Sequence, residues 1–115
     1  MKKRLILVLA LAAAVVAAAV AVPAFAATKT VKVGPNTSFG PKSLKIKSGD
    51  TVRFRWTGSM SHNVVITKGP HIRRKKTISG LRTHGTVPKT FHTKGTYTIV
   101  CEVHLPTMKM TLKVS

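Results

Sequence analysis

Acidic side chains are nearly absent from this sequence. Its 115 residues include 20 Lys and Arg but only two acidic residues, Asp50 and Glu102, so the formal net charge is +18 at pH 7. A field of this sign attracts acidic proteins and anionic surfaces, and added salt weakens that attraction. The composition therefore predicts acidic partners, which could be a protein or an anionic cell-surface polymer.

Cysteine is equally scarce. Cys101 is the only cysteine in the chain, which excludes an intramolecular disulfide. Free cysteine is often a small buried hydrophobic residue, and this interpretation is open for Cys101 when it is considered alone. In an exported protein, however, a lone thiol is exposed to oxidation and to pairing with other thiols. Ligation of a metal would explain why such a residue is present.

Aromatic residues are few, with five after residue 26, and each lies within or beside an apolar strand pattern. Proteins that bind single-stranded nucleic acids stack bases on aromatic side chains within a basic groove, and this chain does not interleave basic and aromatic residues in that way. Its densest group of positive charge is the basic cluster Arg73, Arg74, Lys75 and Lys76. We interpret this cluster as a solvated face and expect no specific binding of nucleic acid.

The N-terminus has the three parts of an export signal. Lys2, Lys3 and Arg4 precede a long apolar run over residues 5–22, and residues 23–26 end in a small-x-small site. This pattern predicts a signal peptide at residues 1–26 and a mature protein at 27–115. The apolar run is also long enough to span a bilayer, so an uncleaved anchor is the alternative. We expect an exported protein, periplasmic or extracellular at the cell surface, whose mature part contacts membranes peripherally at most.

Residues 27–115 are enough for one small domain, near the lower size limit for a stable single core. Removal of the three basic residues of the signal leaves 17 Lys and Arg against two acidic residues, a net charge of +15 with His neutral. We expect this domain to be a monomer.

Apolar residues alternate with basic ones along most of the mature chain, which is typical of half-buried β-strands. In the clearest case Val52, Phe54 and Trp56 alternate with two arginines. Other short apolar runs lie at residues 31–33, 44–46, 64–66, 90–92, 97–101 and 110–114. A hairpin turn is expected at residues 48–50 and another turn at 93–95. The pattern predicts an all-β fold, a β-sandwich of seven to eight strands.

Residues 68–89 fit this pattern least. They contain Gly69-Pro70, the basic cluster, two further glycines and Pro88. We interpret them as an irregular crossover with one short strand near residues 76–78.

A short stretch near the C-terminus, Cys101-Glu-Val-His-Leu-Pro-Thr-Met108, combines a thiol, an imidazole and a thioether. A second imidazole, His62, lies at the entrance of the strand expected at residues 64–66. Soft sulfur ligands together with imidazole suit copper, and two His, one Cys and a weak axial Met form blue-copper sites. We therefore predict one copper ion per chain, held by His62, Cys101, His104 and Met108.

The other histidines and methionines have weaker claims. Met110 is in phase with the inward residues of the last strand and is expected in the core, although as an axial ligand it stays open beside Met108. Met60 is expected at the rim of the site. Three histidines are expected to be solvated: His71, His84 and His92. Asn63 is expected to join the two ligand-bearing segments by hydrogen bonding, as residues around metal ligands commonly do.

Several motifs extend over most of the mature chain. They are the segment FGPKSLKIKSGDTVRFRW at residues 39–56, SHNV at 61–64, TFHTKGTY at 90–97, and Cys101-x-x-His104 followed by Met108. In these motifs the chain resembles the small cupredoxins of the plastocyanin and amicyanin kind. The resemblance implies a Greek-key β-sandwich and a mononuclear type 1 copper that shuttles single electrons, without enzymatic activity. It also implies that His62, Cys101 and His104 are the trigonal ligands and Met108 the axial one.

The resemblance further implies that His104 is the point of electron entry and exit, within a small apolar docking surface at Leu105 and Pro106. The chain departs from the family pattern at Glu102, where Ser or Thr is usual, and in the three residues between His104 and Met108. Two other functions are compatible with these residues. One is a copper carrier or chaperone, and the other is a basic polyanion-binding module on the same fold.

Overall fold

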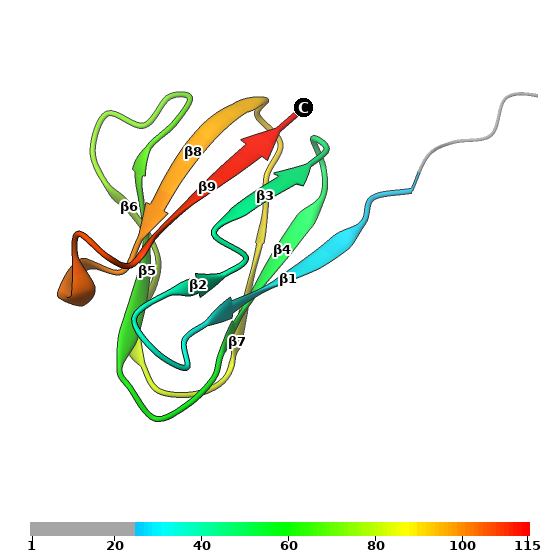
Figure 1. The fold of residues 1–115 in the computed structure, drawn as a ribbon. Helices are drawn as coiled ribbons and strands as arrows, with labels where there is room; N and C mark the ends of the chain where they lie inside the picture. The colour runs from blue at the N-terminus through cyan, green and yellow to red at the C-terminus, as the bar shows by residue number, and fades with distance from the viewer. Residues whose placement is uncertain (1–24) are drawn as a thin grey trace, which may run out of the picture.

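The computed structural model describes residues 25–115 (Figure 1). The predicted signal peptide lies outside the described residues, apart from its last two positions. Within this described part, no helix is long and apolar enough to cross a membrane.

Two β-sheets pack face to face, which confirms the predicted all-β sandwich (Figure 1). The four-stranded sheet has the order β2 (Phe39–Gly40), β1 (Thr28–Val33), β4 (Thr51–Trp56) and β7 (Thr86–Thr90). The five-stranded sheet has the order β3 (Ser43–Ile46), β9 (Lys109–Val114), β8 (Gly95–Val100), β5 (His62–Lys68) and β6 (Lys76–Arg82). Residues 25–115 thus form nine strands, slightly more than the seven to eight expected.

Alternation along the strands separates the core from the basic surface. In the parallel pair β1 and β4, Val31 lies opposite Phe54 and Val33 opposite Trp56, and all four are buried. The residues between them point outward, so that Lys32 lies opposite Arg55 on the outer face. Burial of the apolar face drives this arrangement, at roughly 25 cal/mol per Å² of apolar surface removed from water.

Residues 68–89 are more regular than the sequence analysis predicts. They contain β6 and most of β7 instead of one short strand, because backbone pairing continues where the apolar pattern ends. In β6 only Ser79 is buried, and in β7 no residue is fully buried. Both strands lie at sheet edges, where few side chains need to be apolar. The strand expected at residues 90–92 is the end of β7 followed by a loop.

The turn at residues 48–50 is also different from the expected hairpin. It joins β3 to β4, which belong to different sheets, so the chain crosses from one layer of the sandwich to the other. The carboxylate of Asp50 holds this crossing: it accepts hydrogen bonds from the backbone N of Ala27 at 2.8 Å and of Lys47 at 2.9 Å.

Strand directions bring three chain segments together at one end of the five-stranded sheet. Because β5 and β8 are antiparallel, the start of β5 lies beside the end of β8. Because β8 and β9 are antiparallel, the start of β9 lies there as well. The short 3₁₀ turn η1 (Glu102–His104) follows β8 at this end (Figure 1).

Candidate metal centre

The four predicted ligands occupy the strand ends that meet at this end of the sandwich. His62 is the first residue of β5, as expected for a residue at a strand entrance. Cys101 directly follows β8, His104 is the last residue of η1, and Met108 directly precedes β9. One loop between two neighbouring strands therefore carries three candidates, and the adjacent strand contributes the fourth.

Three donor atoms of this group converge. The Nδ1 atoms of His62 and His104 are 3.1 Å apart, and the Sγ of Cys101 lies 3.8 Å from the first and 3.5 Å from the second. The point equidistant from three atoms so placed is about 2 Å from each, close to the 2.0–2.1 Å and 2.3 Å of metal–nitrogen and metal–sulfur bonds in zinc proteins. The three side chains therefore fit a single metal ion without rearrangement.

Hydrogen bonds within the loop hold these atoms in place. The backbone N of Cys101 donates to the O of Met108 at 3.1 Å, and the N of Met108 donates to the O of His104 at 3.0 Å. Cys101 and Met108 are fully buried, whereas His104 is partly exposed. Met110 is also buried, but it lies in β9 opposite Ile99 and belongs to the core between the sheets.

His62 is completely buried, and its surroundings favour the neutral imidazole that a metal requires. Burial is the main cause that lowers the pKa of His62 from its ordinary 6.5, and the nearby His104 lowers this pKa further. The backbone O of His62 accepts a hydrogen bond of 2.9 Å from the Nε1 of Trp56. The other ring nitrogen, Nε2, is buried with no hydrogen-bond partner among the described residues, and it packs near Gly34.

Asn63 joins the two ligand-bearing segments, as the sequence analysis predicts. Its Oδ1 accepts a hydrogen bond of 2.8 Å from the backbone N of Glu102, and its Nδ2 donates one of 3.1 Å to the Glu102 carboxylate. The second carboxylate oxygen accepts a hydrogen bond of 2.8 Å from the Nζ of Lys75. The hydrogen bond from Lys75 is the main cause that lowers the pKa of Glu102, so the carboxylate is ionised at neutral pH.

The sequence alone does not indicate that Lys75 contacts this site. Its position in a run of four basic residues suggests a solvated face, and only the fold brings it to Glu102. The one sequence feature that points to an altered contact here is Glu102, which follows Cys101 where Ser or Thr is usual and which implies a different partner for Asn63.

The remaining histidines lie away from the donor atoms in solvent-exposed positions, as predicted: His71, His84 and His92. Phe91 beside His92 is buried, which confirms the expected inward phase. Met60 is 43% exposed, so it belongs to the surface.

Comparison with known proteins agrees with this geometry. Residues 26–115 match the family model described as copper binding proteins, plastocyanin/azurin family. The chain belongs to this family. It is 34% identical over 92 residues to plastocyanin from Prochlorothrix hollandica, covering 73% of this chain and 70% of that protein.

Solved structures show the same relationship. A reduced amicyanin variant superposes with a TM-score of 0.67 at 25% identity, covering 76% of this cupredoxin and 82% of amicyanin. Oxidised plastocyanin from Dryopteris crassirhizoma superposes with a TM-score of 0.64 at 27% identity, covering 75% and 99% of the two chains.

Family membership and the converging donor atoms together establish the function. This cupredoxin is a type 1 copper protein with a single His–Cys–His–Met site, and it carries electrons between redox partner proteins. It is not an enzyme, because its family transfers electrons without transforming a substrate of its own.

Proposed function

We propose that copper is bound in the trigonal plane by the Nδ1 of His62, the Sγ of Cys101 and the Nδ1 of His104, with the thioether of Met108 as the weak axial ligand. The convergence of the three donor atoms within 3.8 Å of one another carries this proposal. A bound copper supplies one-electron oxidation and reduction. The protein's own residues fix the donors, exclude water and direct the partner.

Met108 is the better axial candidate for a structural reason. Backbone hydrogen bonds tie it to both Cys101 and His104, so its position is coupled to the positions of two ligands. Met110 is two residues further along β9, and its backbone is committed to the pairing with Ile99 in the sheet. This arrangement supports the assignment made from sequence.

We further propose that electrons enter and leave through His104. This imidazole is partly exposed, whereas His62 and Cys101 are fully buried. Its neighbours Val103 and Leu105 are 54% and 51% exposed, so an apolar surface surrounds the accessible ligand. Exposed apolar residues around a functional group are typical of a docking site. A partner that excludes water here would bring its own redox centre close to the copper.

The partner is expected to be an acidic redox protein. The mature domain, residues 27–115, carries a net charge of +15, and this field can steer an acidic protein toward it. The N-terminal pattern supports export, so we place this monomeric carrier in the periplasm or at the cell surface, where an anionic polymer is a second partner for the same charge. The anchor alternative applies if residues 1–26 are retained.

Electron transfer to an acidic partner gives the test of this proposal. We expect the second-order rate constant in stopped-flow experiments to fall steeply with ionic strength, because steering accelerates association by about 10- to 1000-fold at low salt. A rate independent of salt would refute the acidic partner and leave retention on an anionic polymer as the role of the charge. Rapid loss of copper to a chelator would instead favour a copper carrier or chaperone.

A further inference from the structure

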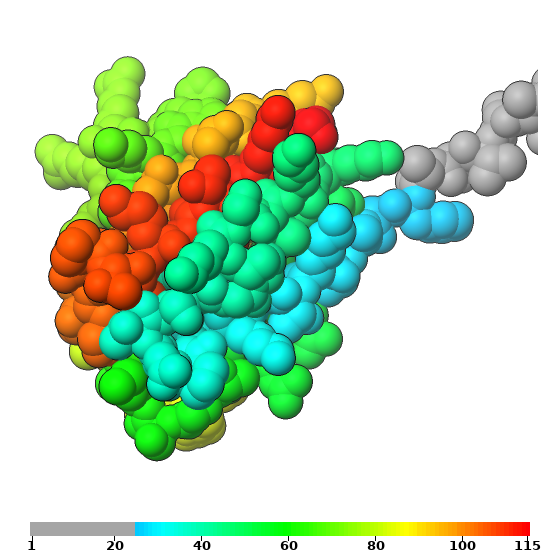
Figure 2. Space-filling model, in the orientation of Figure 1, coloured from blue at the N-terminus to red at the C-terminus, as the bar shows by residue number. Residues whose placement is uncertain are grey.

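A cavity of about 680 Å³ lies at the other end of the sandwich from the converging donor atoms, between the β5–β6 and β7–β8 connections. Its volume is within the range of sites that hold small molecules, about 300–1,000 Å³. The basic cluster lines it together with Lys89 and His71. Figure 2 shows the long side chains of the β5–β6 connection, in light green, projecting from the molecule at this edge.

The charge of this pocket is largely uncompensated. Five Lys and Arg side chains line it, and no acidic residue does. Of the two acidic residues in the chain, Asp50 binds backbone N–H groups elsewhere, and Glu102 pairs only with Lys75. Four cationic residues therefore line this pocket with no ion-pair partner among the described residues. Like charges gathered in this way repel one another and raise the local concentration of anions, so a bound anion would relieve the repulsion.

The walls of the pocket are fixed before any ligand arrives. A Cβ atom at Gly69 would lie 2.5 Å from the ring of Tyr97, so the start of the crossover packs directly on this ring. The Tyr97 hydroxyl donates a hydrogen bond of 2.7 Å to the O of Thr93 in the opposite wall. His71 has a φ of 60°, a left-handed conformation that is uncommon for a non-glycine residue and that is often found at binding sites.

The floor of the pocket is apolar. Ile66, Phe91 and Tyr97 form it, each no more than 5% exposed, and the two aromatic rings pack edge to face at 5.2 Å. A floor of this kind lowers the local dielectric constant, which strengthens the attraction between the basic side chains and a bound anion.

We propose that this pocket binds the phosphate groups of a polyanion that carries at least two of them. Arg73 and Arg74 provide two planar guanidinium groups, which bind phosphate in a bidentate manner, and the lysines add point charges. The phosphates belong either to a soluble oligophosphate or to a phosphate-rich polymer. None of the pocket residues is a proposed copper ligand; Lys75, which pairs with Glu102 beside Cys101, is the one contact between the pocket and the metal centre.

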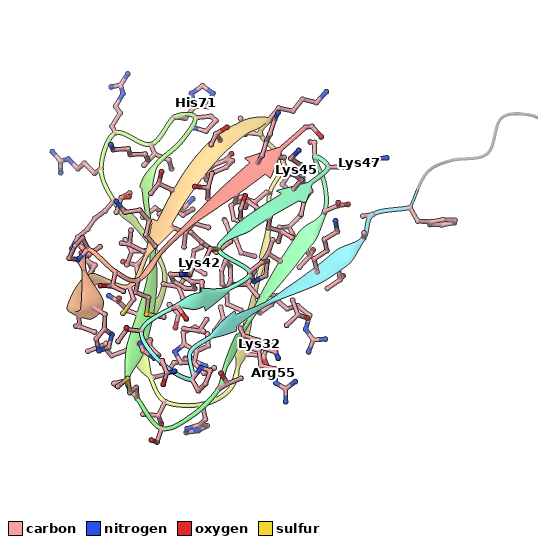
Figure 3. The ribbon with its side chains drawn as sticks, viewed as in Figure 1. Lys32, Lys42, Lys45, Lys47, Arg55 and His71 are labelled. Carbon is pink, nitrogen blue, oxygen red and sulfur yellow. The ribbon has the colours of Figure 1, made fainter. Side chains whose placement is uncertain are left out.

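Calorimetric titration of the copper-loaded mature protein with inorganic tripolyphosphate tests the proposal. The double variant Arg73→Gln/Arg74→Gln should bind about tenfold more weakly or worse, since it removes two guanidinium groups that form charge-assisted, bidentate hydrogen bonds with phosphate. The matched control is Lys32→Gln/Arg55→Gln, which removes the same charge from a neighbouring pair on the outer face of β1 and β4. Figure 3 labels this pair far from His71, and neither residue lines the pocket.

The control variant should retain binding within about threefold of the wild type, because distant charges are screened beyond about 10 Å at 0.1 M salt. An equal loss in the two double variants would overturn the proposal, since it would show a response to net charge alone. So would the absence of binding, or binding of polyglutamate as tight as that of tripolyphosphate. Displacement of tripolyphosphate by poly(glycerol phosphate) would support the proposal and identify the polymer as the source. An unchanged copper absorption band verifies that each variant is folded.

Discussion

Asn63 and Glu102 hold each other by two hydrogen bonds, one from the Glu102 backbone N to the Asn63 side chain and one from that side chain to the Glu102 carboxylate. Each residue directly follows a proposed copper ligand, His62 or Cys101. The pair therefore fixes the separation of two ligands that are 39 residues apart in the chain. Lys75, a member of the basic cluster, forms an ion pair with the same Glu102 carboxylate.

Loss of this pair should loosen the site. In Asn63→Ala both hydrogen bonds disappear, and the partly buried Glu102 N–H is left without a partner, which costs about 1–3 kcal/mol of unfolding free energy. We also expect a shifted reduction potential, because His62 and Cys101 are no longer tied. Asn36→Ala, at an exposed asparagine, is the control for urea unfolding and voltammetry. Equal behaviour of the two variants would contradict this role of Asn63.

Gly34 is the second residue that positions a ligand. It has a φ of 100°, and a Cβ there would lie 2.5 Å from the backbone O of Thr57 and 3.4 Å from the Nε2 of His62. Gly34→Ala should therefore destabilise the fold by more than about 1 kcal/mol and alter the copper spectrum through His62. Gly80→Ala, where the added Cβ meets nothing within 4 Å, should be close to neutral in both measurements. A silent Gly34→Ala would show that this contact does not constrain His62.

Asp50 gives the fold a defined response to acid. Its pKa is lowered from 3.8, first by the hydrogen bond from the N of Ala27 and then by that from Lys47. A lowered pKa means that the ionised carboxylate stabilises the native state above the unfolded pKa, and that this contribution is lost as pH falls through the folded pKa. Asp50→Asn should thus be less stable than wild type at about pH 7, and the difference should shrink below about pH 4. Urea unfolding of both proteins across this pH range measures the difference in stability. A difference that does not change with pH would contradict the stabilising role of the ionised Asp50 carboxylate.

The two buried methionines should respond differently to substitution. Met108→Leu should retain copper and raise the reduction potential, because loss of a weak thioether donor disfavours Cu(II) more than Cu(I). Met110→Leu, a volume-conserving change in the core, should cost less than about 1.5 kcal/mol and leave the potential unchanged. Voltammetry of both proteins compares them, and the reverse pattern would make Met110 the axial ligand.

Most of the fold could be predicted from the two-residue alternation, because β1, β4, β8 and β9 each bury one face. The edge strands β6 and β7 could not, since they bury almost no side chains and their backbone pairing leaves no trace in the apolar pattern. The turn at residues 48–50 was recognisable, but local sequence does not specify which sheet the chain joins after it.

The copper ligands were predictable because their side-chain chemistry is rare in this chain, with one Cys and a neighbouring His and Met. The hydrogen bonds and close contacts that support these ligands were less predictable. The position of Asn63 beside His62 predicts that it joins the two ligand-bearing segments, but not that Glu102 is its partner. The roles of Lys75 and Gly34 depend on close approaches between distant segments and could not be predicted.

The absorption spectrum of the mature protein with Cu(II), compared with that of Cys101→Ser, tests the central claim most directly. We predict an intense visible band from thiolate-to-copper charge transfer in the wild type. We predict none in Cys101→Ser, which should stay folded because the two side chains are similar in size. A wild type without this band, or a Cys101→Ser variant that retains it, would contradict the assignment of a type 1 copper site to His62, Cys101, His104 and Met108.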